Sequence, residues 1–207
     1  MRRFRHAPVS ALCAGLLSAL QPAPSTAQQE KVLGKVIVVA PYDAGVPLER
    51  VPANVQSATA DEIERAQSLD LTDFLNRDFG SVSINHAQNN PLQPDVSFRG
   101  FTASPLLGLS PGFTVYQNGV RINEPFGDTV NWDLIPLSAV SSVQLLAGSN
   151  PVFGLNSLGG SLSLDMKNGF EYHRAEAEVY GGSFERVGAS AQLGGNNGSW
   201  GYYGNVY

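Results

Sequence analysis

Cysteine is nearly absent from this 207-residue sequence, which contains only Cys13. Leu12 precedes it where a lipid-attachment site would have a small residue, so Cys13 does not fit a lipid anchor. Without the N-terminal segment described below, the chain has no cysteine at all. Disulfides and thiolate metal sites are therefore excluded from the remainder.

Charged residues are also scarce, with 13 Lys and Arg against 18 Asp and Glu. A nucleic-acid-binding domain carries a basic stripe, and this sequence has none, so no nucleic-acid partner is predicted. The chain is instead rich in turn residues, with 22 Gly and 13 Pro. This composition favours a turn-rich β protein over a helical one.

The apolar run at residues 11–20 is too short to cross a bilayer as a helix, which takes about 20 residues. Three arginines at positions 2, 3 and 5 precede it, and the small residues Ser-Thr-Ala follow at 25–27. Together they predict a secretory signal peptide at residues 1–27, with an ordinary basic region favoured over a twin-arginine signal. Its removal leaves 10 Lys and Arg against 18 Asp and Glu, a net charge of −8.

Residues 28–50 combine one strand-like segment with a linker-like sequence. The segment at residues 36–40 is small or β-branched and apolar, and Pro41 stops it. It predicts either a buried first strand or an extended segment that adds itself to the sheet edge of another protein.

Two short helices are predicted next. Thr59 and Glu62 have the spacing of a capping box at the start of the first helix. In the second helix Leu71, Phe74 and Leu75 share one face, and residues 79–80 (Phe-Gly) end it. Residues 81–85 then alternate with the period of a strand.

From residue 95 to residue 160, short strand patterns alternate with turns of Gly, Pro and Asn. The clearest is a hairpin of residues 113–116 and 120–123 around Asn118-Gly119. Two long loops, residues 102–112 and 124–132, mix apolar or aromatic residues with polar ones. One helical turn at residues 135–140 leads into a strand at residues 142–146.

The last part of the chain alternates differently. Residues 175–180 and 187–193 alternate strictly, and a third strand-like piece occupies residues 200–207. Such alternation is typical of transmembrane barrel strands, of which a single-chain barrel needs at least about eight. The 37 residues after Phe170 allow about three strands, so we expect a truncated chain rather than a barrel shared between several chains.

Catalytic patterns are missing from the sequence. His86 and His173 lack a Ser or Cys nucleophile pattern nearby, and Asp128 and Asp133 lack the spacing of metal ligands. The glycines at residues 154–160 are not followed by the Lys and Ser or Thr of a phosphate-binding loop. The sequence therefore predicts no enzyme, no metal site and no cofactor.

Four features in order resemble the plug domain of TonB-dependent outer-membrane receptors. Residues 36–40 resemble the TonB box, and residues 62–75 resemble the opening helices of the plug. Residues 98–101 (Phe-Arg-Gly-Phe) resemble the Arg-Gly strand end of the family. Residues 115–123, 143–148 and 150–164 resemble the closing strands and their glycine-rich turn, with Asn118-Gly119 where the family has Asp-Gly.

The resemblance implies an α+β plug domain at residues 51–168, a small mixed sheet with short helices. The first antiparallel strands of a transmembrane β-barrel would follow at residues 169–207. It also implies energy-coupled uptake across the bacterial outer membrane, with the plug inside the barrel and the N-terminus in the periplasm. The implied substrate is a small molecule, by default a ferric siderophore, with cobalamin, a nickel complex or a sugar as alternatives.

The resemblance also implies roles for particular residues. The segment expected to bind TonB, the inner-membrane energy transducer, consists of Val36, Ile37, Val38, Val39 and Ala40. The substrate contacts are expected on the two long loops, at Leu106, Leu107, Leu109, Ser110, Phe126, Asp128, Asn131 and Trp132. Gln144 and Ala147 stand where the family has a Glu and an Arg that fix the plug to the barrel wall, which leaves Arg99 as the charged anchor.

A second interpretation is a surface adhesin whose chains share one barrel. It predicts long internal repeats or a stalk, and the sequence shows no internal repeat. The receptor interpretation is therefore preferred.

Overall fold

The computed structural model describes residues 36–37, 46–47, 54–149, 153–183 and 187–207. The predicted signal peptide and Val38, Val39 and Ala40 of the expected TonB-binding segment lie outside the described residues. Strand β1 (Val36–Ile37) pairs antiparallel with β2 (Val46–Pro47) in a sheet of two strands. The backbone of the first two residues of the expected segment is therefore extended.

Two helices follow strand β3 (Val55–Thr59). Helix α1 (Ala60–Ala66) begins with the predicted capping box, in which the backbone N–H of Thr59 donates to Glu62 Oε2 at 2.8 Å. Helix α2 (Leu71–Asp78) begins at Asp70, whose side chain accepts from the N–H of Asp73. Leu71, Phe74 and Leu75 are buried on one face of α2, and Phe79 ends the helix, as the sequence predicts.

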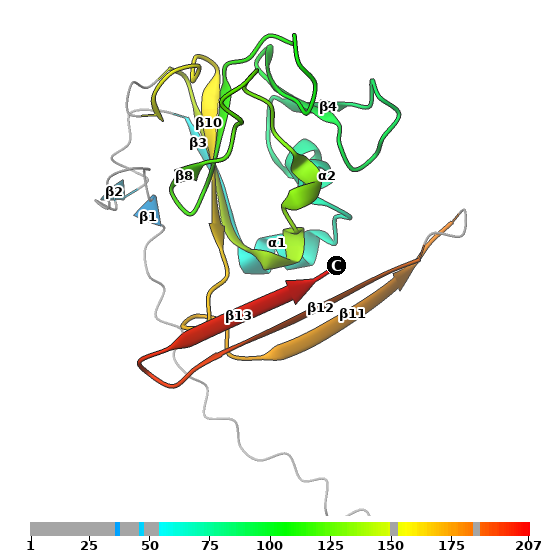
Figure 1. Ribbon diagram of the computed structural model, residues 1–207, viewed down its shortest axis with the longest axis vertical. Coiled ribbons are helices and arrows are strands. Elements are labelled where there is room, and N and C mark those ends of the chain that lie inside the picture. Colours follow the sequence, from blue (N-terminus) through cyan, green and yellow to red (C-terminus); the bar gives the residue numbers. More distant parts are fainter. Residues whose placement is uncertain (1–35, 38–45, 48–53, 150–152, 184–186) are drawn as a thin grey trace, which may run out of the picture. The chain divides into compact units, whose positions relative to one another are not determined.

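A mixed sheet of five strands forms the centre of the domain (Figure 1). Its order is β3, β9 (Val140–Ala147), β10 (Gly160–Met166), β7 (Phe113–Gln117) and β8 (Val120–Arg121). Strands β10 and β7 are parallel, and the other pairs are antiparallel. The strand β3, which follows the N-terminal segment, is therefore an edge strand of this sheet.

A smaller antiparallel sheet contains β4 (Val82–Asn85), β5 (Asp95–Phe98) and β6 (Phe101–Ala103). Strands β5 and β6 are joined by a two-residue turn in which Arg99 has φ 53° and Gly100 has φ 87°. The β7–β8 turn has the same form, with φ 49° at Asn118 and 77° at Gly119. Positive φ at both central residues matches a type I′ hairpin, as expected for Asn-Gly.

The core lies between the two sheets and the helices. The rings of Phe98 from β5 and Phe113 from β7 pack with centroids 5.6 Å apart. Gly160 is needed beside them, because a Cβ there would collide with the Leu146 carbonyl oxygen and lie 3.0 Å from the Phe98 ring. The largest side chains that are fully buried are Phe74, Phe98, Phe113, Phe153, Leu71, Leu75, Leu145, Leu162, Leu164, Val96 and Val115.

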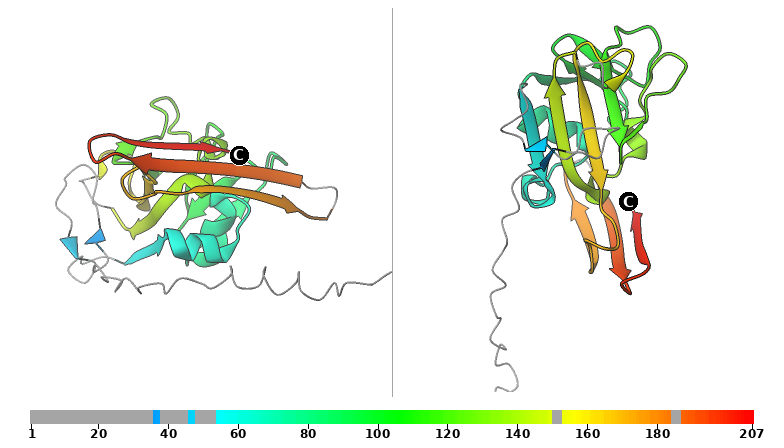
Figure 2. Two further views of the ribbon diagram at one scale, coloured as in Figure 1. Left: turned by 90° about the horizontal axis from the view of Figure 1, so that it is seen from below. Right: turned by 90° about the vertical axis from the view of Figure 1, so that its left-hand side faces the viewer.

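The predicted helical turn at residues 135–140 forms as one 3₁₀ turn, η4 (Leu137–Ala139), and a second 3₁₀ turn that was not predicted, η3 (Trp132–Leu134), precedes it. The last described part is an antiparallel sheet of β11 (Ala175–Gly181), β12 (Val187–Asn196) and β13 (Gly201–Val206), drawn in orange to red in Figure 2. The predicted mixed sheet with short helices, followed by antiparallel strands, is thus confirmed. Among the residues described here, no helix has the length and apolar character needed to span a membrane.

Candidate functional site: a loop surface on the plug

The first loop (residues 104–112) presents apolar side chains to solvent. Leu106, Leu107 and Leu109 are all exposed, and so is Ser110. The start of the loop is fixed by Ser104, which is buried and donates from Oγ to the buried carboxylate of Asp95. The same Oγ accepts from the N–H of Leu106 at 2.9 Å. Polar contacts therefore hold the base of the loop while its leucines stay outside the core.

The second loop (residues 122–131) closes on itself and packs against the first. The N–H of Glu124 donates to the Thr129 carbonyl at 2.8 Å, and the Asn131 side chain donates to Glu124 Oε1 at 2.7 Å. Gly127, with φ 78°, lies directly under Leu107, so any Cβ at this position would overlap that leucine. Phe126 at the tip is 78% exposed. Two of the expected contact residues, Leu107 and Phe126, thus lie on loops that touch.

Trp132 differs from the expectation that it contacts substrate. Its side chain is only 3% exposed, and its Nε1 donates to the carbonyl of Ala103 at 3.2 Å. A tryptophan buries a large apolar area once its N–H has a partner, and the carbonyl at the end of β6 provides one. Trp132 is therefore a core residue beneath the two loops, and its side chain presents almost no surface to a substrate.

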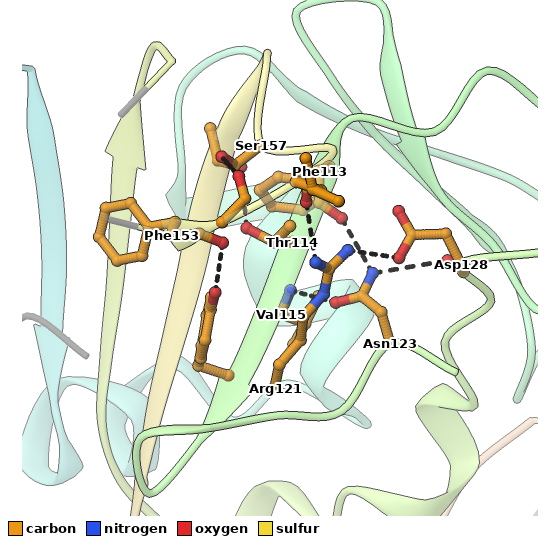
Figure 3. Close-up of polar contacts among 12 residues, drawn as sticks. Phe113, Thr114, Val115, Arg121, Asn123, Asp128, Phe153 and Ser157 are labelled. Carbon is orange, nitrogen blue, oxygen red and sulfur yellow. Dashed lines mark hydrogen bonds and ion pairs between the residues drawn. The ribbon is translucent and has the colours of Figure 1, made fainter. Parts of the chain in front are cut away.

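Arg121 connects the second loop to a third loop, which the structure describes at residues 148–149 and 153–159. Figure 3 shows its guanidinium directed toward the carboxylate of Asp128, at 2.5 Å from Nη2 to Oδ1. Its Nη1 donates to the carbonyl of Leu155 at 2.8 Å. Asp128 was expected to contact substrate, but its carboxylate is mostly buried in this ion pair. Arg121, which sequence reasoning left without a role, thus joins two loops that are far apart in the sequence.

Asn123 links strand β7 to the second loop through hydrogen bonds to the backbone of both. Its Oδ1 accepts from the N–H of Val115 at 2.7 Å, and its Nδ2 donates to the carbonyls of Phe113 and Asp128. The sequence pattern predicts a strand through residue 123, but β8 ends at Arg121. The Asn123 side chain therefore makes the hydrogen bonds to β7 that the backbone of a further strand residue would make. These bonds fix where the second loop begins.

Tyr116 attaches the third loop to β7. Its hydroxyl donates to the carbonyl of Phe153 at 2.5 Å, and the two rings lie 5.7 Å apart. Burial raises the pKa of the Tyr116 hydroxyl, although nearby Arg121 acts to lower it and Asp128 to raise it. The raised pKa keeps this hydroxyl protonated, and a donor to the third loop, up to a higher pH than for an exposed tyrosine.

The third loop itself was missed as a candidate contact. Its leucines, Leu155 and Leu158, are 83% and 60% exposed, more than those of the first loop. The signal was present in the sequence, since two leucines stand in a turn rich in Gly, Asn and Ser. What the sequence does not reveal is that Arg121 and Tyr116 hold this turn beside the second loop.

Arg99 is exposed in the β5–β6 turn, with its guanidinium over the Phe98 ring at 5.3 Å from the centroid. Gln144 is buried in β9, opposite Ser163 of β10 and Ser57 of β3. Ala147, the last residue of β9, is half-buried. The role of Arg99 as an anchor remains a prediction. Across the part of the chain that the structure describes, no cluster of three His, Cys, Asp or Glu could hold a metal ion.

Comparison with known families decides what this loop-bearing domain is. Residues 47–161, more than half of the chain, match the family model described as TonB-dependent receptor plug domain. The chain belongs to this family. The resemblance seen in the sequence is thereby confirmed, and the family is one of transport receptors rather than an enzyme class.

The proteins that this chain resembles are much longer than the chain itself. The vitamin B12 transporter BtuB of Photobacterium profundum is 27% identical over 169 residues, which cover 80% of this chain and 26% of the transporter. The pyoverdine-bound receptor FpvA of Pseudomonas aeruginosa has a TM-score of 0.61 at 14% identity, covering 78% of this chain and 20% of FpvA. The ferric yersiniabactin uptake receptor FyuA of Yersinia pestis has a TM-score of 0.52 at 21% identity, covering 70% and 22%. The chain thus spans about a quarter or less of each, and the two structures support the fold alone.

Proposed function

We propose that this chain is the N-terminal part of an outer-membrane receptor whose plug gates energy-coupled uptake of a small molecule. The observation that carries the proposal is the loop surface, which we define as the first, second and third loops. It joins three loops through the Leu107–Gly127 contact and the Arg121 hydrogen bonds, and it leaves six large apolar side chains exposed. These are Leu106, Leu107, Leu109, Phe126, Leu155 and Leu158.

Exposed apolar patches supported by a rigid polar base are typical of ligand-binding surfaces. Asp128 and Asn131 then act by fixing the second loop, because their side chains are already engaged by Arg121 and Glu124. Ser110 remains a candidate polar contact beside the three leucines of the first loop. Substrate held here would leave when the plug changes conformation.

The substrate that we propose first is a ferric siderophore. Support comes from the fold, which the chain shares with receptors for ferric pyoverdine and ferric yersiniabactin. A corrinoid is the second candidate, because a relative with 27% identity is a vitamin B12 transporter.

The remaining assignments follow from the family. Residues 1–27 direct export as a signal peptide, and residues 51–168 form the plug. Residues 169–207 begin the barrel in the outer membrane, with the N-terminus in the periplasm. Val36, Ile37, Val38, Val39 and Ala40 add as a strand to TonB when substrate is bound, and Arg99 anchors the plug to the barrel wall.

The test uses the complete receptor, with and without residues 36–40. Binding and uptake of ferric pyoverdine and of cyanocobalamin are measured on cells of the two strains. We expect the deletion to leave binding of the transported probe intact and to abolish its uptake. Normal uptake by the deletion variant would refute the role of residues 36–40. If neither probe binds, ferric pyoverdine and cyanocobalamin are both refuted as substrates.

A further inference from the structure

Lys167, which directly follows strand β10, is a lysine whose side chain is only 7% exposed. Its Nζ lies 3.2 Å from Glu64 Oε1 on helix α1 and 3.4 Å from Gln192 Oε1 on strand β12. It also lies 5.1 Å from the centre of the Tyr172 ring. A buried ammonium needs such partners to offset its lost hydration. The position of Lys167 Nζ is therefore set by these three partners. One side chain therefore contacts helix α1, strand β12 and Tyr172 in its own segment between β10 and β11.

Gly169 makes the next part of this connection. A Cβ on Gly169 would collide with the backbone of Tyr202 and lie 2.6 Å from the carbonyl oxygen of Gly195. The side chain of Asn196 donates to the Gly169 carbonyl at 2.9 Å. The segment between β10 and β11 thus lies directly against the backbones of β12 and β13, an approach that only glycine permits.

Tyr172 completes the connection. Its buried ring packs edge-to-face on Tyr203 of β13, with centroids 5.6 Å apart. Its hydroxyl donates to Glu176 Oε2 at 3.0 Å, and the same oxygen accepts from Gln192 Nε2. We call residues 167–172 the joint.

The N-terminal strand of the five-stranded sheet is held by backbone pairing with one neighbouring strand. Strand β3, five residues long, pairs with β9 and has no partner on its other side among the described strands. Force applied through the N-terminus would reach the short β1–β2 pair first, then this edge strand, and then helix α1, since α1 follows β3 directly. The salt bridge from Glu64 to Lys167 is the contact that ties α1 to the joint.

We infer that Lys167 is a positioning residue that fixes helix α1 and strand β12 to the end of the last plug strand. The joint then stays closed while the plug gives way from the β3 edge. The second part rests on the proposed function, whereas the first part is a property of the folded chain alone.

The experiment measures amide hydrogen exchange in the complete receptor, in outer-membrane vesicles without added substrate. The variants are Lys167→Met, Glu64→Gln and the double variant, with Arg77→Met as a matched control. Arg77 makes an exposed ion pair with Asp73 on the neighbouring helix α2 at 3.4 Å, so its loss removes a charge pair without touching the joint.

We expect residues 60–66 of α1 to exchange about tenfold faster in Lys167→Met and Glu64→Gln, as for loss of a charge-assisted hydrogen bond. The double variant should match Lys167→Met, because the two changes break one contact. Helix α2 should keep its exchange rate in the three variants of Lys167 and Glu64, and helix α1 should keep its exchange rate in Arg77→Met, whose lost ion pair lies within α2. Glu64→Gln preserves size and an acceptor at a partly exposed site, so it tests the contact even if Lys167→Met folds poorly.

Unchanged exchange of α1 in both single variants would overturn the inference. Equal acceleration of α1 and α2 would also overturn it, because it would mean general loosening instead of a specific contact. The result is independent of substrate and TonB, so its failure leaves the proposed uptake function standing. Conversely, normal uptake after deletion of residues 36–40 would leave the role of Lys167 intact.

Discussion

In the sheets beneath the loop surface, Phe98, Val115 and Leu162 are fully buried, whereas Phe126 and Leu155 on the loops are mostly exposed. Buried polar side chains occur in both regions, and in the loop region they hold the backbone. Asn123 is buried, and Arg121 is largely covered by its partners. In the sheets, apolar burial supplies most of the stability, and in the loops buried polar groups fix the backbone. The exposed apolar residues of the loops are therefore available for a ligand because the fold does not need them.

The largest loss of stability is expected for Phe98→Ala. Truncating this fully buried ring removes its contacts with Phe113 and leaves a cavity beside Gly160. We expect the free energy of unfolding to fall by about 3–5 kcal/mol. Urea unfolding of wild type and variant measures it, with Phe126→Ala as the control that changes the same residue type outside the core. Similar losses for the two variants would show that the loop tip is as important to stability as the core.

The next effect is that of Asn123→Ala. The substitution leaves the N–H of Val115 without its side-chain acceptor and the Phe113 carbonyl without the amide donor. Leaving buried groups unpaired costs about 1–3 kcal/mol, and urea unfolding should show a loss in this range. Asn131→Ala is the matched control, because Asn131 bonds to Glu124 in a solvent-exposed contact. Its expected loss is below about 0.5 kcal/mol, and a larger loss than that of Asn123→Ala would contradict the comparison.

Arg121→Gln should affect local order more than global stability. The ion pair with Asp128 is partly accessible, so we expect a loss of about 1 kcal/mol in unfolding free energy. The second and third loops lose their link through Leu155, and limited proteolysis should cleave both loops faster than in wild type. Arg121→Lys keeps the charge but cannot span both partners in the same way, so it should give an intermediate result. Cleavage of only one loop would disprove the proposed link.

The smallest effect on stability is expected for Phe126→Ser. Because the ring is mostly exposed, the unfolding free energy should change by less than about 0.5 kcal/mol. If the loop surface binds substrate, the affinity of the complete receptor for its transported probe should fall about tenfold, as for an exposed aromatic anchor. Val120→Ser is the control, since Val120 is also an exposed apolar residue but lies in the hairpin at the other end of β7. Equal losses of affinity in both variants would argue against a localised site.

The local elements of this fold were predictable from the sequence. Asn118-Gly119 predicts a hairpin because both residues tolerate positive φ, and the spacing of Thr59 and Glu62 predicts a helix start. The alternation of residues 175–193 likewise predicts the β11–β12 pair, which forms in register. The turn and the helix start depend on contacts between close neighbours in the chain. The two strands are recognisable because their sequence alternates with the period of a β-strand.

The candidate site was predictable only in part. The exposed leucines of the first loop and Phe126 stand out as apolar residues in turn-rich segments, and they do lie on the loop surface. Trp132 shares that pattern but is buried, since the end of β6 supplies a carbonyl for its N–H. The third loop was missed because its partner, Arg121, is 34 residues away from Leu155.

The sequence by itself determined where this protein turns, where its helices begin and which strands alternate, because those features depend on backbone preferences and short-range periodicity. The tertiary structure alone decided which apolar loop residues remain outside the core. It also decided that Lys167 meets Glu64, 103 residues earlier in the chain. A buried charge or a loop contact is set by whichever partners the fold brings within a few ångströms, and the sequence order of those partners does not reveal that proximity.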